Sequence, residues 1–211
     1  SDILREEAKQ KMSPFYDVSE DNLKFEEKAA KYIDFLNANA YDKERDVRTN
    51  IAGEFQKSNL AAALQTAELI CGRLDEDKIY EALSQIRISG RMEEIAPGII
   101  VDVSHNIQGM QGFVQTVEAN YHGMKKRILF AASHQNEEEY MKNILKTIPE
   151  IEAFYTVGIH KRRIDEAEFQ DAFRKMIDRN QETTVCFVVG SFYLAGMAKE
   201  FINQEEENVR L

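Results

Sequence analysis

Polar side chains that could bind a ligand follow three apolar runs of this sequence. The segment 102–106 (Asp-Val-Ser-His-Asn) follows the run 99–101, Ser133 and His134 follow a second run, and Ser191 follows a third. In open α/β sheets, ligands bind in the crevice beyond the carboxyl ends of the strands. A helical pattern comes after each run, and the N-terminus of a helix offers free N–H groups to an anion. The spacing therefore predicts a ligand site built from strand ends.

Each of these residues also has an ordinary structural explanation. Asp102, Asn106 and Ser133 are residue types that cap helix N-termini. A histidine such as His134 is more often a strand-end residue than a catalyst. The basic runs 125–127 and 160–163 are typical of solvated loops. Taken one residue at a time, the structural and the functional interpretations both stay open.

The elements that must position these residues alternate between strands and helices. Nearly continuous apolar runs predict strands that are buried on both faces, and apolar residues at i, i+3, i+4 and i+7 predict the helices between them. The predicted strands are 98–103, 127–132, 153–157 and 184–189. The predicted helices are 108–121, 137–146, 166–179 and 193–202, followed by a solvated tail at 204–207. This alternation predicts an α/β fold with a doubly wound, mostly parallel, Rossmann-like sheet.

The residues before this pattern predict a smaller unit. A helix is expected at 59–70, because Gly72 is a stop signal just beyond it. A second helix is expected at 75–86, because its acidic start suits the positive end of a helix dipole. Residues 6–12 are also expected to be helical.

Two interpretations stay open for the rest of the first fifty residues. Segments 31–37 and 46–51 suit a β-hairpin, and a helix over 25–36 suits the local propensities equally well.

Composition and charge exclude several classes of protein. The 211 residues carry 27 Lys and Arg against 37 Asp and Glu, a net charge of −10, so nucleic acid is not expected as the main partner. No apolar run is long enough to span a membrane, and the N-terminal residues lack the apolar core of a signal peptide, so a cytoplasmic protein is expected. Cys71 and Cys186 are too few for a disulfide scaffold or a four-ligand zinc site. No glycine is followed by lysine, so the Gly-rich phosphate loop ending in Gly-Lys is absent from this sequence.

Four segments share their order and spacing with one known family. Residues 90–93 read Gly-Arg-Met-Glu, and 99–106 form an apolar strand that ends in Asp-Val-Ser-His-Asn. Residues 53–63 contain Gly-Glu-Phe-Gln-Lys-Ser-Asn, and 189–196 contain Gly-Ser-Phe-Tyr-Leu. These segments resemble the Gly-Arg-hydrophobic-Glu, Asp-Gly-Ala-His-Asn, Gly-x-His-Gln-x-x-Asn and Thr-Gly-Ser-Leu-Tyr-Leu motifs of the folylpolyglutamate synthase and dihydrofolate synthase family, within the Mur ligase superfamily.

The resemblance implies that the sequence corresponds to the C-terminal part of such an enzyme. Residues 1–88 would be a small α+β remnant of the central ATPase domain, and residues 89–211 would be the C-terminal glutamate-ligase domain. In the family, ATP phosphorylates the terminal carboxylate of a folate. The amine of glutamate then attacks the acyl phosphate to form an amide. ATP with magnesium is therefore the implied cofactor, and folate and glutamate are the implied substrates.

The resemblance also assigns roles to individual residues. Asn59 would contact the adenine, Asp102 would lie near the ribose, and Arg91 would be a catalytic side chain on the phosphates. His105 would be catalytic and would bind substrate, orienting or deprotonating an amine. Ser191 would lie near the incoming glutamate, and no metal ligand is implied in this chain. The structural alternative for Arg91 is an ion pair with a neighbouring glutamate at 93 or 94.

This sequence departs from the family pattern at several positions. Phe55 stands where the family has His, Ile88-Ser89 replaces Trp-Pro, and Val103-Ser104 replaces Gly-Ala. The phosphate loop, the catalytic Lys and the magnesium ligands are also missing, so the chain alone is expected to be inactive without an N-terminal ATPase domain. Two alternatives stay open: a truncated, non-catalytic paralogue that acts as a binding or interaction module, and a fragment of a Mur-type peptide ligase.

Overall fold

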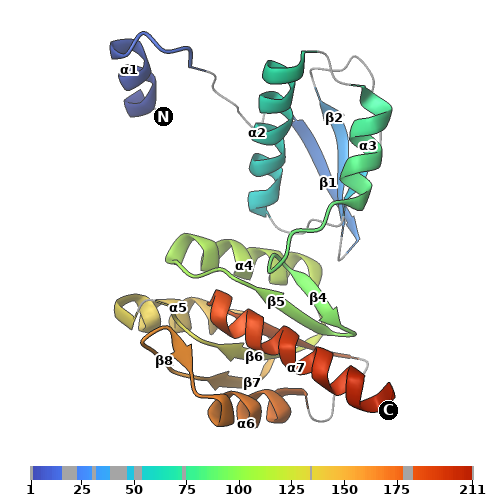
Figure 1. Cartoon of the computed structure of the whole chain (residues 1–211), viewed down its shortest axis with the longest axis vertical. Coiled ribbons are helices and arrows are strands. Elements are labelled where there is room, and N and C mark those ends of the chain that lie inside the picture. Colours follow the sequence, from blue (N-terminus) through green and yellow to red (C-terminus); the bar gives the residue numbers. More distant parts are fainter. Residues whose placement is uncertain are drawn as a thin grey trace.

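The computed structural model describes residues 2–15, 23–29, 32–38, 47–49, 54–72, 75–133, 135–177 and 183–210. Within these residues the chain forms two separate sheets, each with its own helices (Figure 1), and a small two-stranded hairpin. Helix α1 (Asp2–Gln10) lies apart from both sheets and buries none of its residues. Helix α1 begins four residues earlier than the sequence predicted. None of the described helices is long and apolar enough to cross a bilayer.

The first unit is a small antiparallel sheet flanked by two helices. Its strands β1 (Leu23–Ala29), β2 (Tyr32–Ala38) and β3 (Val47–Thr49) lie in that order, with Ile33 paired to Thr49. Helices α2 (Glu54–Cys71) and α3 (Glu76–Gln85) flank this sheet (Figure 1). The hairpin interpretation is therefore correct, the helix interpretation of 25–36 is wrong, and β1 is a strand that the sequence did not predict.

The second unit is a five-stranded mixed sheet in the order β4-β5-β10-β6-β7. Four strands are parallel, namely β5 (Ile99–Asp102), β10 (Thr184–Val189), β6 (Lys125–Phe130) and β7 (Ile151–Thr156). Strand β4 (Glu93–Ala96) pairs antiparallel with β5 at one edge. The predicted doubly wound, mostly parallel sheet is confirmed, and the division at residue 88 stays a prediction.

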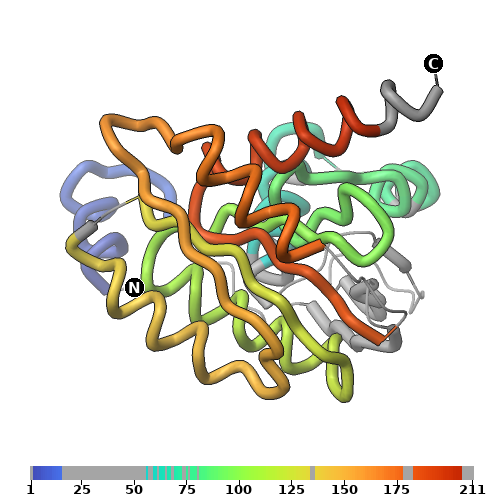
Figure 2. The backbone as a smooth tube through the Cα atoms, turned by 90° about the horizontal axis from the view of Figure 1, so that it is seen from below, coloured from blue at the N-terminus to red at the C-terminus, as the bar shows by residue number. Residues whose placement is uncertain are grey.

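Helices cover both faces of this sheet. Helices α4 (Ile107–Asn120) and α5 (Glu138–Leu145) follow β5 and β6, whereas α6 (Glu166–Ile177) and α7 (Phe192–Arg210) follow β7 and β10. Val185, Phe187 and Val189 of β10 pack in the core beneath α4 and α5, and Cys186 and Val188 pack in the core beneath α6 and α7. Side chains alternate between the faces of a strand, so a strand buried on both faces must be apolar throughout. The path of the chain around the sheet can be followed in Figure 2.

Three strands of the second unit, β4 and the two strands of a short hairpin, were not predicted. The sequence did not predict strand β4, because Glu93 and Glu94 are not residue types typical of strands. Pro97 and Gly98, which form the turn from β4 to β5, were a local signal for it. Gly98 has φ +72°, which suits the third position of a Pro-Gly turn. The hairpin of β8 (Ile159–His160) and β9 (Arg163–Ile164) falls in a segment that was expected to be a solvated loop.

Helix α7 also differs from its prediction. It continues to Arg210, so the expected solvated tail at 204–207 is helical. Arg174 of α6 holds this part of α7, because its guanidinium lies 3.2 Å from a carboxylate oxygen of Glu205.

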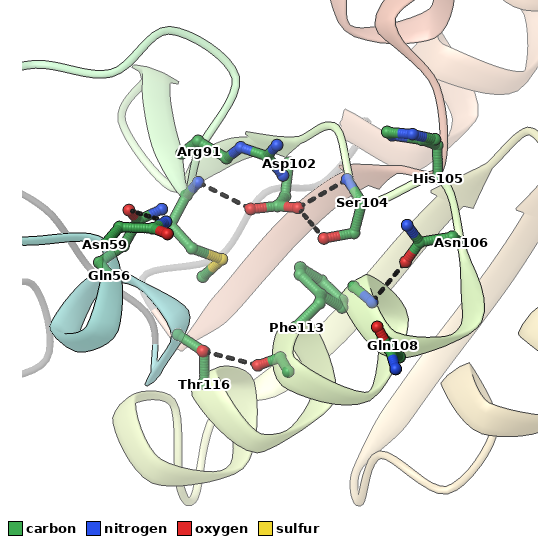
Figure 3. Close-up of a pocket in the computed structure, with 13 residues that line it drawn as sticks. Gln56, Asn59, Arg91, Asp102, Ser104, His105, Asn106, Gln108, Phe113 and Thr116 are labelled. Atoms are coloured by element: carbon green, nitrogen blue, oxygen red, sulfur yellow. Dashed lines mark hydrogen bonds between the residues drawn. The ribbon is translucent and has the colours of Figure 1, made fainter. Parts of the chain in front are cut away.

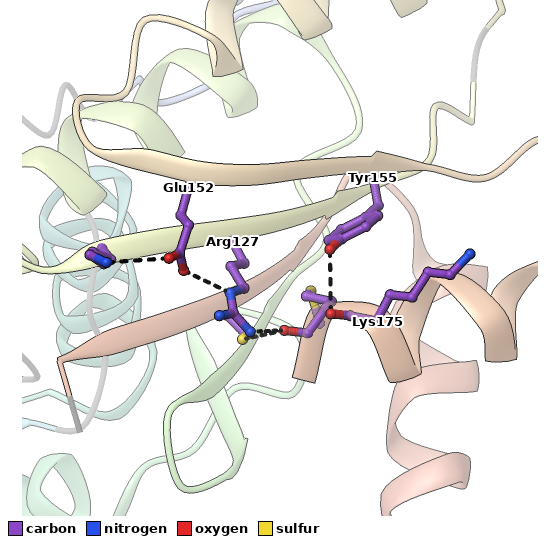
Figure 4. Close-up of polar contacts among 7 residues, drawn as sticks. Arg127, Glu152, Tyr155 and Lys175 are labelled. Atoms are coloured by element: carbon purple, nitrogen blue, oxygen red, sulfur yellow. Dashed lines mark hydrogen bonds and ion pairs between the residues drawn. The ribbon is translucent and has the colours of Figure 1, made fainter. Parts of the chain in front are cut away.

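Basic residues at the amino edge of the sheet are paired rather than solvated. The side chain of Lys126 is fully buried, and its Nζ donates to Glu150 at 2.9 Å and to the carbonyl of Met124 at 2.8 Å. Arg127 donates to Glu152 at 3.0 Å and to the carbonyl of Met176 at the C-terminal end of α6, also at 3.0 Å (Figure 4). The interpretation of 125–127 as loop charges is therefore wrong for Lys126 and Arg127.

Candidate functional site

A pocket of about 250 Å³ lies where β5 ends, between the two units of the chain (Figure 3). Helix α2 contributes Gln56 and Asn59, and the turn before β4 contributes Arg91. The end of β5 contributes Asp102, and the loop into α4 contributes His105. The pocket therefore joins side chains of α2 to side chains of the segment from Arg91 to α4, more than thirty residues further along the chain.

Asp102 connects the strand end to the turn that carries Arg91. Its carboxylate is almost fully buried, and one oxygen accepts a hydrogen bond from the backbone N–H of Met92 at 3.0 Å. The other oxygen accepts from the N–H of Ser104 at 2.8 Å and from the Ser104 hydroxyl. Burial raises the pKa of Asp102, although these hydrogen bonds and the charge of Arg91 oppose that shift. Asp102 therefore orders the wall of the pocket and does not cap α4.

The turn around Arg91 is held from several sides. Val103 donates its N–H to the carbonyl of Gly90 at 2.8 Å, and Gly90 has φ +72°. A Cβ at Gly90 would lie 2.7 Å from Val103, so this close approach requires glycine. Glu93 accepts from the N–H of Gly90 at 2.6 Å and pairs with Lys199 of α7 at 2.7 Å. The turn is therefore fixed both to the strand end and to α7.

Arg91 itself remains available to a ligand. Burial alone would raise the pKa of Glu93, but Lys199 and the N–H of Gly90 hold that pKa below its usual range. Glu93 is thus neutralised by Lys199. Among the described residues no ion pair joins Arg91 to Glu93 or Glu94. The structure therefore does not contain the ion pair that was the structural alternative for Arg91. The charge of Arg91 acts on Asp102, and its side chain is half-buried at the pocket wall.

His105 is oriented by one hydrogen bond and one ring contact. Its Nδ1 lies 3.0 Å from the carbonyl oxygen of Val103. A carbonyl can only accept, so Nδ1 carries the proton of this bond and Nε2 holds the lone pair of the neutral ring. The ring of Phe192 packs against the imidazole at a centroid distance of 5.6 Å. The hydrogen bond and the ring contact therefore fix the orientation of the His105 ring, and Nε2 of the neutral ring can accept a hydrogen bond.

The N-terminus of α4 also faces the pocket. The side chain of Asn106 caps the helix by accepting the N–H of Gly109 at 2.7 Å, so the capping interpretation of Asn106 is correct. A Cβ at Gly109 would lie 3.1 Å from the capping oxygen, which favours glycine at this position. The positive end of the helix dipole adds to the charge of Arg91 and favours an anionic ligand.

Several pocket residues were not among the sequence candidates. Gln56 is buried and accepts a hydrogen bond from the Asn59 side chain at 3.1 Å. Gln108 and Thr116 line the pocket from α4. The signal that could have found them is periodicity, since Gln108, Gly112 and Thr116 stand four residues apart and share one face of the helix.

Ser191 lies at the same edge of the sheet but does not line the pocket. The N–H of Gly190 lies 3.4 Å from the carbonyl oxygen of Asp102, which places the end of β10 beside the end of β5. The Ser191 hydroxyl is buried and accepts the N–H of Tyr193 at 3.1 Å, so it caps α7. Ser133 donates to the carbonyl of Gly190 at 3.5 Å, and His134 lies outside the described residues.

The described residues contain no cluster of three or more His, Cys, Asp or Glu side chains that could hold a metal ion. What they offer instead is amides, one guanidinium, one carboxylate and one imidazole around an open pocket. The helices after β5 and after its neighbour β10 lie on opposite faces of the sheet, so the pocket is at a topological switch point. The fold and the pocket define an open α/β protein with a ligand crevice at the carboxyl edge of its sheet.

No protein-family model matches the sequence, and no curated protein matches it. Solved structures of folylpolyglutamate synthases do match it. An FPGS–AMPPCP–folate complex aligns with a TM-score of 0.75 at 18% identity, over 95% of this chain and 50% of that one. The folylpolyglutamate synthase of Thermotoga maritima aligns with a TM-score of 0.68 at 20% identity, over 96% and 51%. E. coli FolC in complex with ADP aligns with a TM-score of 0.69 at 15% identity, over 88% and 47%.

The chain resembles these synthases in structure over most of its residues and spans about half of their length. At these identities the likeness establishes the fold. The α/β architecture expected from the four motifs is therefore confirmed, whereas the residue roles stay predictions.

Proposed function

We propose that this chain supplies part of an ATP-dependent carboxylate–amine ligase site of the folylpolyglutamate synthase type, which adds glutamate to folates. The observation that carries the proposal is the common pocket of Asn59, Arg91, Asp102 and His105. These four residues lie in three of the motifs that resemble the family, and the fold brings them together. Structural neighbours that are described as complexes with AMPPCP and folate, or with ADP, support a nucleotide and a folate as ligands.

The pocket suits the nucleoside and phosphate parts of ATP. The amide groups of Gln56 and Asn59 offer the donors and acceptors that an adenine edge requires. One acceptor position remains on the Asp102 oxygen that binds Met92, and it is available to a ribose hydroxyl. Arg91 and the N-terminus of α4 supply positive charge for the phosphates.

Magnesium does not fit the described residues as a directly bound ion. Asp102, the carboxylate in the pocket, is buried and already accepts three hydrogen bonds. Magnesium prefers an octahedral shell of oxygens and usually keeps several waters. In this proposal the ion arrives with the nucleotide and is held by the ATPase domain.

His105 and Arg91 would serve the chemistry from this side of the site. In amide formation, an amine attacks an acyl phosphate and must lose a proton. The Nε2 lone pair of His105 can accept a hydrogen bond from that amine and orient it. Arg91 can stabilise the negative charge that is transferred with the phosphoryl group. Ser191 would act near the incoming glutamate through its cap on α7.

The chain alone is proposed to be inactive. Phosphoryl transfer depends mostly on positioning and on stabilising charge, and the sequence has no Gly-rich phosphate loop. A separate N-terminal ATPase domain is therefore the proposed partner. A cytoplasmic location is part of the proposal and agrees with two free cysteines, Cys71 and Cys186.

Two experiments test this proposal. The purified chain is assayed for ligation of labelled glutamate to a reduced folate with magnesium and ATP, and no product above the blank is expected. The coding sequence upstream of Ser1 is then read, and an in-frame Gly-rich phosphate loop with its Lys is expected. If such a loop is present, the longer gene product should ligate, and an Arg91→Ala variant of it should be strongly impaired. Turnover by the chain alone, or an inactive longer product, would contradict the proposal.

A non-catalytic binding module is the second candidate, and one observation favours it. The hydroxyl of Ser104, which replaces a small Ala of the family motif, occupies an oxygen of Asp102. That oxygen is then less available to a nucleotide. The Ser104→Ala variant separates the two candidates. Tighter ATP binding by the variant supports a nucleotide site, and no ATP binding by either protein supports the module.

A further inference from the structure

The β8–β9 hairpin carries four consecutive basic residues at its tip. Ile159 pairs with Ile164 and His160 pairs with Arg163, which leaves Lys161 and Arg162 as a two-residue turn. Both turn residues have positive φ, 47° and 64°. Turns of this kind strongly prefer Asn-Gly, because most side chains are strained at positive φ. Lys-Arg is therefore an unfavourable choice for the backbone.

The hairpin is anchored to the sheet and projects from the edge that also carries the pocket. It follows β7, and Val157, the residue after that strand, donates its N–H to the carbonyl of Phe130 at 3.1 Å. Ile164 is buried in the core beneath α6 and α7, and Ile159 packs against that core. Because β5 and β7 are parallel to the strands between them, the hairpin and the pocket lie at the same carboxyl edge, with β10 and β6 between them.

The basic side chains at this tip are exposed and have no ion-pair partner among the described residues. His160, Lys161, Arg162 and Arg163 are all exposed, and no ion pair or hydrogen bond joins their side chains to another described residue. Elsewhere in the described part of residues 89–211, seven basic side chains lie within 3.3 Å of a carboxylate oxygen: Lys125, Lys126, Arg127, Lys142, Arg174, Lys175 and Lys199. Arg91 and Lys146 also make no ion pair with another described residue, but each stands alone, whereas the tip places Lys161, Arg162 and Arg163 side by side.

Backbone strain and charge repulsion, which both raise the free energy of the folded chain, thus coincide at this turn. The backbone of Lys161 and Arg162 is strained, and adjacent cations repel each other. Contacts with the described residues offset neither the strain nor the repulsion. A bound anion would offset the repulsion between the cations. A tight hairpin also holds the cationic groups on a rigid support, which reduces the entropy lost when a ligand binds.

We infer that the β8–β9 tip, residues 160–163, is a binding site for a small flexible polyanion that carries several carboxylate or phosphate groups. Arginine binds both groups in a bidentate manner, and lysine adds a point charge. This site is separate from the pocket and does not depend on the ligase proposal. An extended nucleic acid does not suit it, because the acidic remainder of the chain would repel a long polyanion.

The experiment uses the whole chain and three probes: inorganic tripolyphosphate, tri-γ-glutamate and a short DNA duplex. Heteronuclear NMR titrations report both the affinity and the backbone amides that respond. We expect tripolyphosphate or tri-γ-glutamate to shift the amides of 160–163, with an affinity that falls as salt rises. The probe that binds more tightly identifies phosphate or carboxylate as the natural group.

The decisive variant is Lys161→Asn/Arg162→Gly, which removes two charges and installs the residues that the turn prefers. It should be at least as resistant to heat as the parent chain, and it should bind the small polyanion about tenfold more weakly or worse. The swapped variant Lys161→Arg/Arg162→Lys keeps both charges and should keep binding. Lys146→Asn, which removes an exposed lysine at the end of α5, is the matched control and should bind like the parent.

Three results would overturn the inference. The first is the absence of binding by both small probes. The second is undiminished binding by the Asn-Gly variant, or equal loss in the Lys146→Asn control. The third is tighter binding of duplex DNA than of either small polyanion, which would mark the tip as a nucleic-acid contact.

Discussion

The two edges of the five-stranded sheet use charged residues in opposite ways. At the amino edge, Lys126 and Arg127 are buried, and each is matched by a glutamate and a backbone carbonyl. At the carboxyl edge, Arg91 lines an open pocket and makes no ion pair with another described residue. One edge therefore contributes to stability through its charges, and the other keeps charge available for a ligand.

The pKa values of the carboxylates also differ between the two edges. Hydrogen bonds from Lys126 and Arg127 hold the pKa values of Glu150 and Glu152 below their usual range. Burial raises the pKa of Asp102. An exposed carboxylate beside a cation is stabilised as an anion, whereas a buried one is destabilised even when it is hydrogen-bonded. The role of a polar cluster in such a sheet therefore depends on the partners of its side chains rather than on their residue types.

The largest expected effect comes from breaking the amino edge. Arg127→Met leaves the carbonyl of Met176 with only the weak thiol donor of Cys186, and it leaves Glu152 with Lys125 as its remaining cationic neighbour. We expect a loss of about 2 kcal/mol in the free energy of unfolding. Lys175→Met is the matched control, because Lys175 pairs with Asp171 on the exposed surface of α6, and it should cost less than about 0.5 kcal/mol. Equal losses in urea unfolding of the two variants would contradict the comparison.

The second prediction concerns the free cation of the pocket. Arg91→Ala should weaken ATP binding about tenfold, because a charge-assisted contact with a phosphate is lost. The free energy of unfolding should change less than in Arg127→Met, because Arg91 makes no ion pair with another described residue and its charge is the smallest of the effects on the pKa of Asp102. Calorimetric titration measures the affinity, and thermal unfolding measures the stability. A large loss of stability with unchanged ATP affinity would make Arg91 a structural residue.

The third prediction is that the two edges respond oppositely to acid. Glu152 has a lowered pKa, so the stability that it contributes is complete above its ordinary value of 4.5 and is lost as the pH falls below that value. Asp102 has a raised pKa, so protonation favours the folded chain as the pH falls through that raised value. Glu152→Gln should therefore flatten the acid side of the stability profile, and Asp102→Asn should steepen it. Urea unfolding over an acid series measures both slopes, and slopes that change in the same direction would refute the assignment.

The smallest expected effect concerns the link between α7 and the turn around Arg91. Lys199 binds Glu93 at 2.7 Å and the hydroxyl of Ser89 at 2.6 Å, and both members of the ion pair are partly exposed. Lys199→Met should cost less than about 1 kcal/mol in stability. It should also weaken ATP binding slightly, because the turn loses one of its supports. An affinity loss as large as that of Arg91→Ala would show that Lys199 itself contacts the nucleotide.

The architecture of the second unit could be predicted from the sequence because its strands are buried on both faces. Runs such as 185–189 are apolar without alternation, which is typical of a parallel sheet that helices cover on both faces. Helix α4 was predictable because its buried residues repeat at the helical period. These signals are local, so one sequence is enough to show them.

Other features were hidden because they depend on partners distant in the sequence. Lys126 is fully buried because Glu150 lies beside it on the neighbouring strand, and nothing near residue 126 indicates that pairing. Gln56 enters the pocket only because α2 lies near α4. Strand β4 has the polar composition of an edge strand, and its Pro97-Gly98 turn was the one local signal for it.

The measurement that tests the central claim most directly is a heteronuclear NMR map of the chain titrated with AMPPCP and magnesium. We predict that the amides of Asn59, Arg91, His105 and Gly109 shift together with one affinity. Those of Lys125–Arg127 at the amino edge should stay unchanged. Shifts confined to the amino edge, or no shift at the pocket at saturating nucleotide, would show that the crevice between α2 and the end of β5 does not receive ATP.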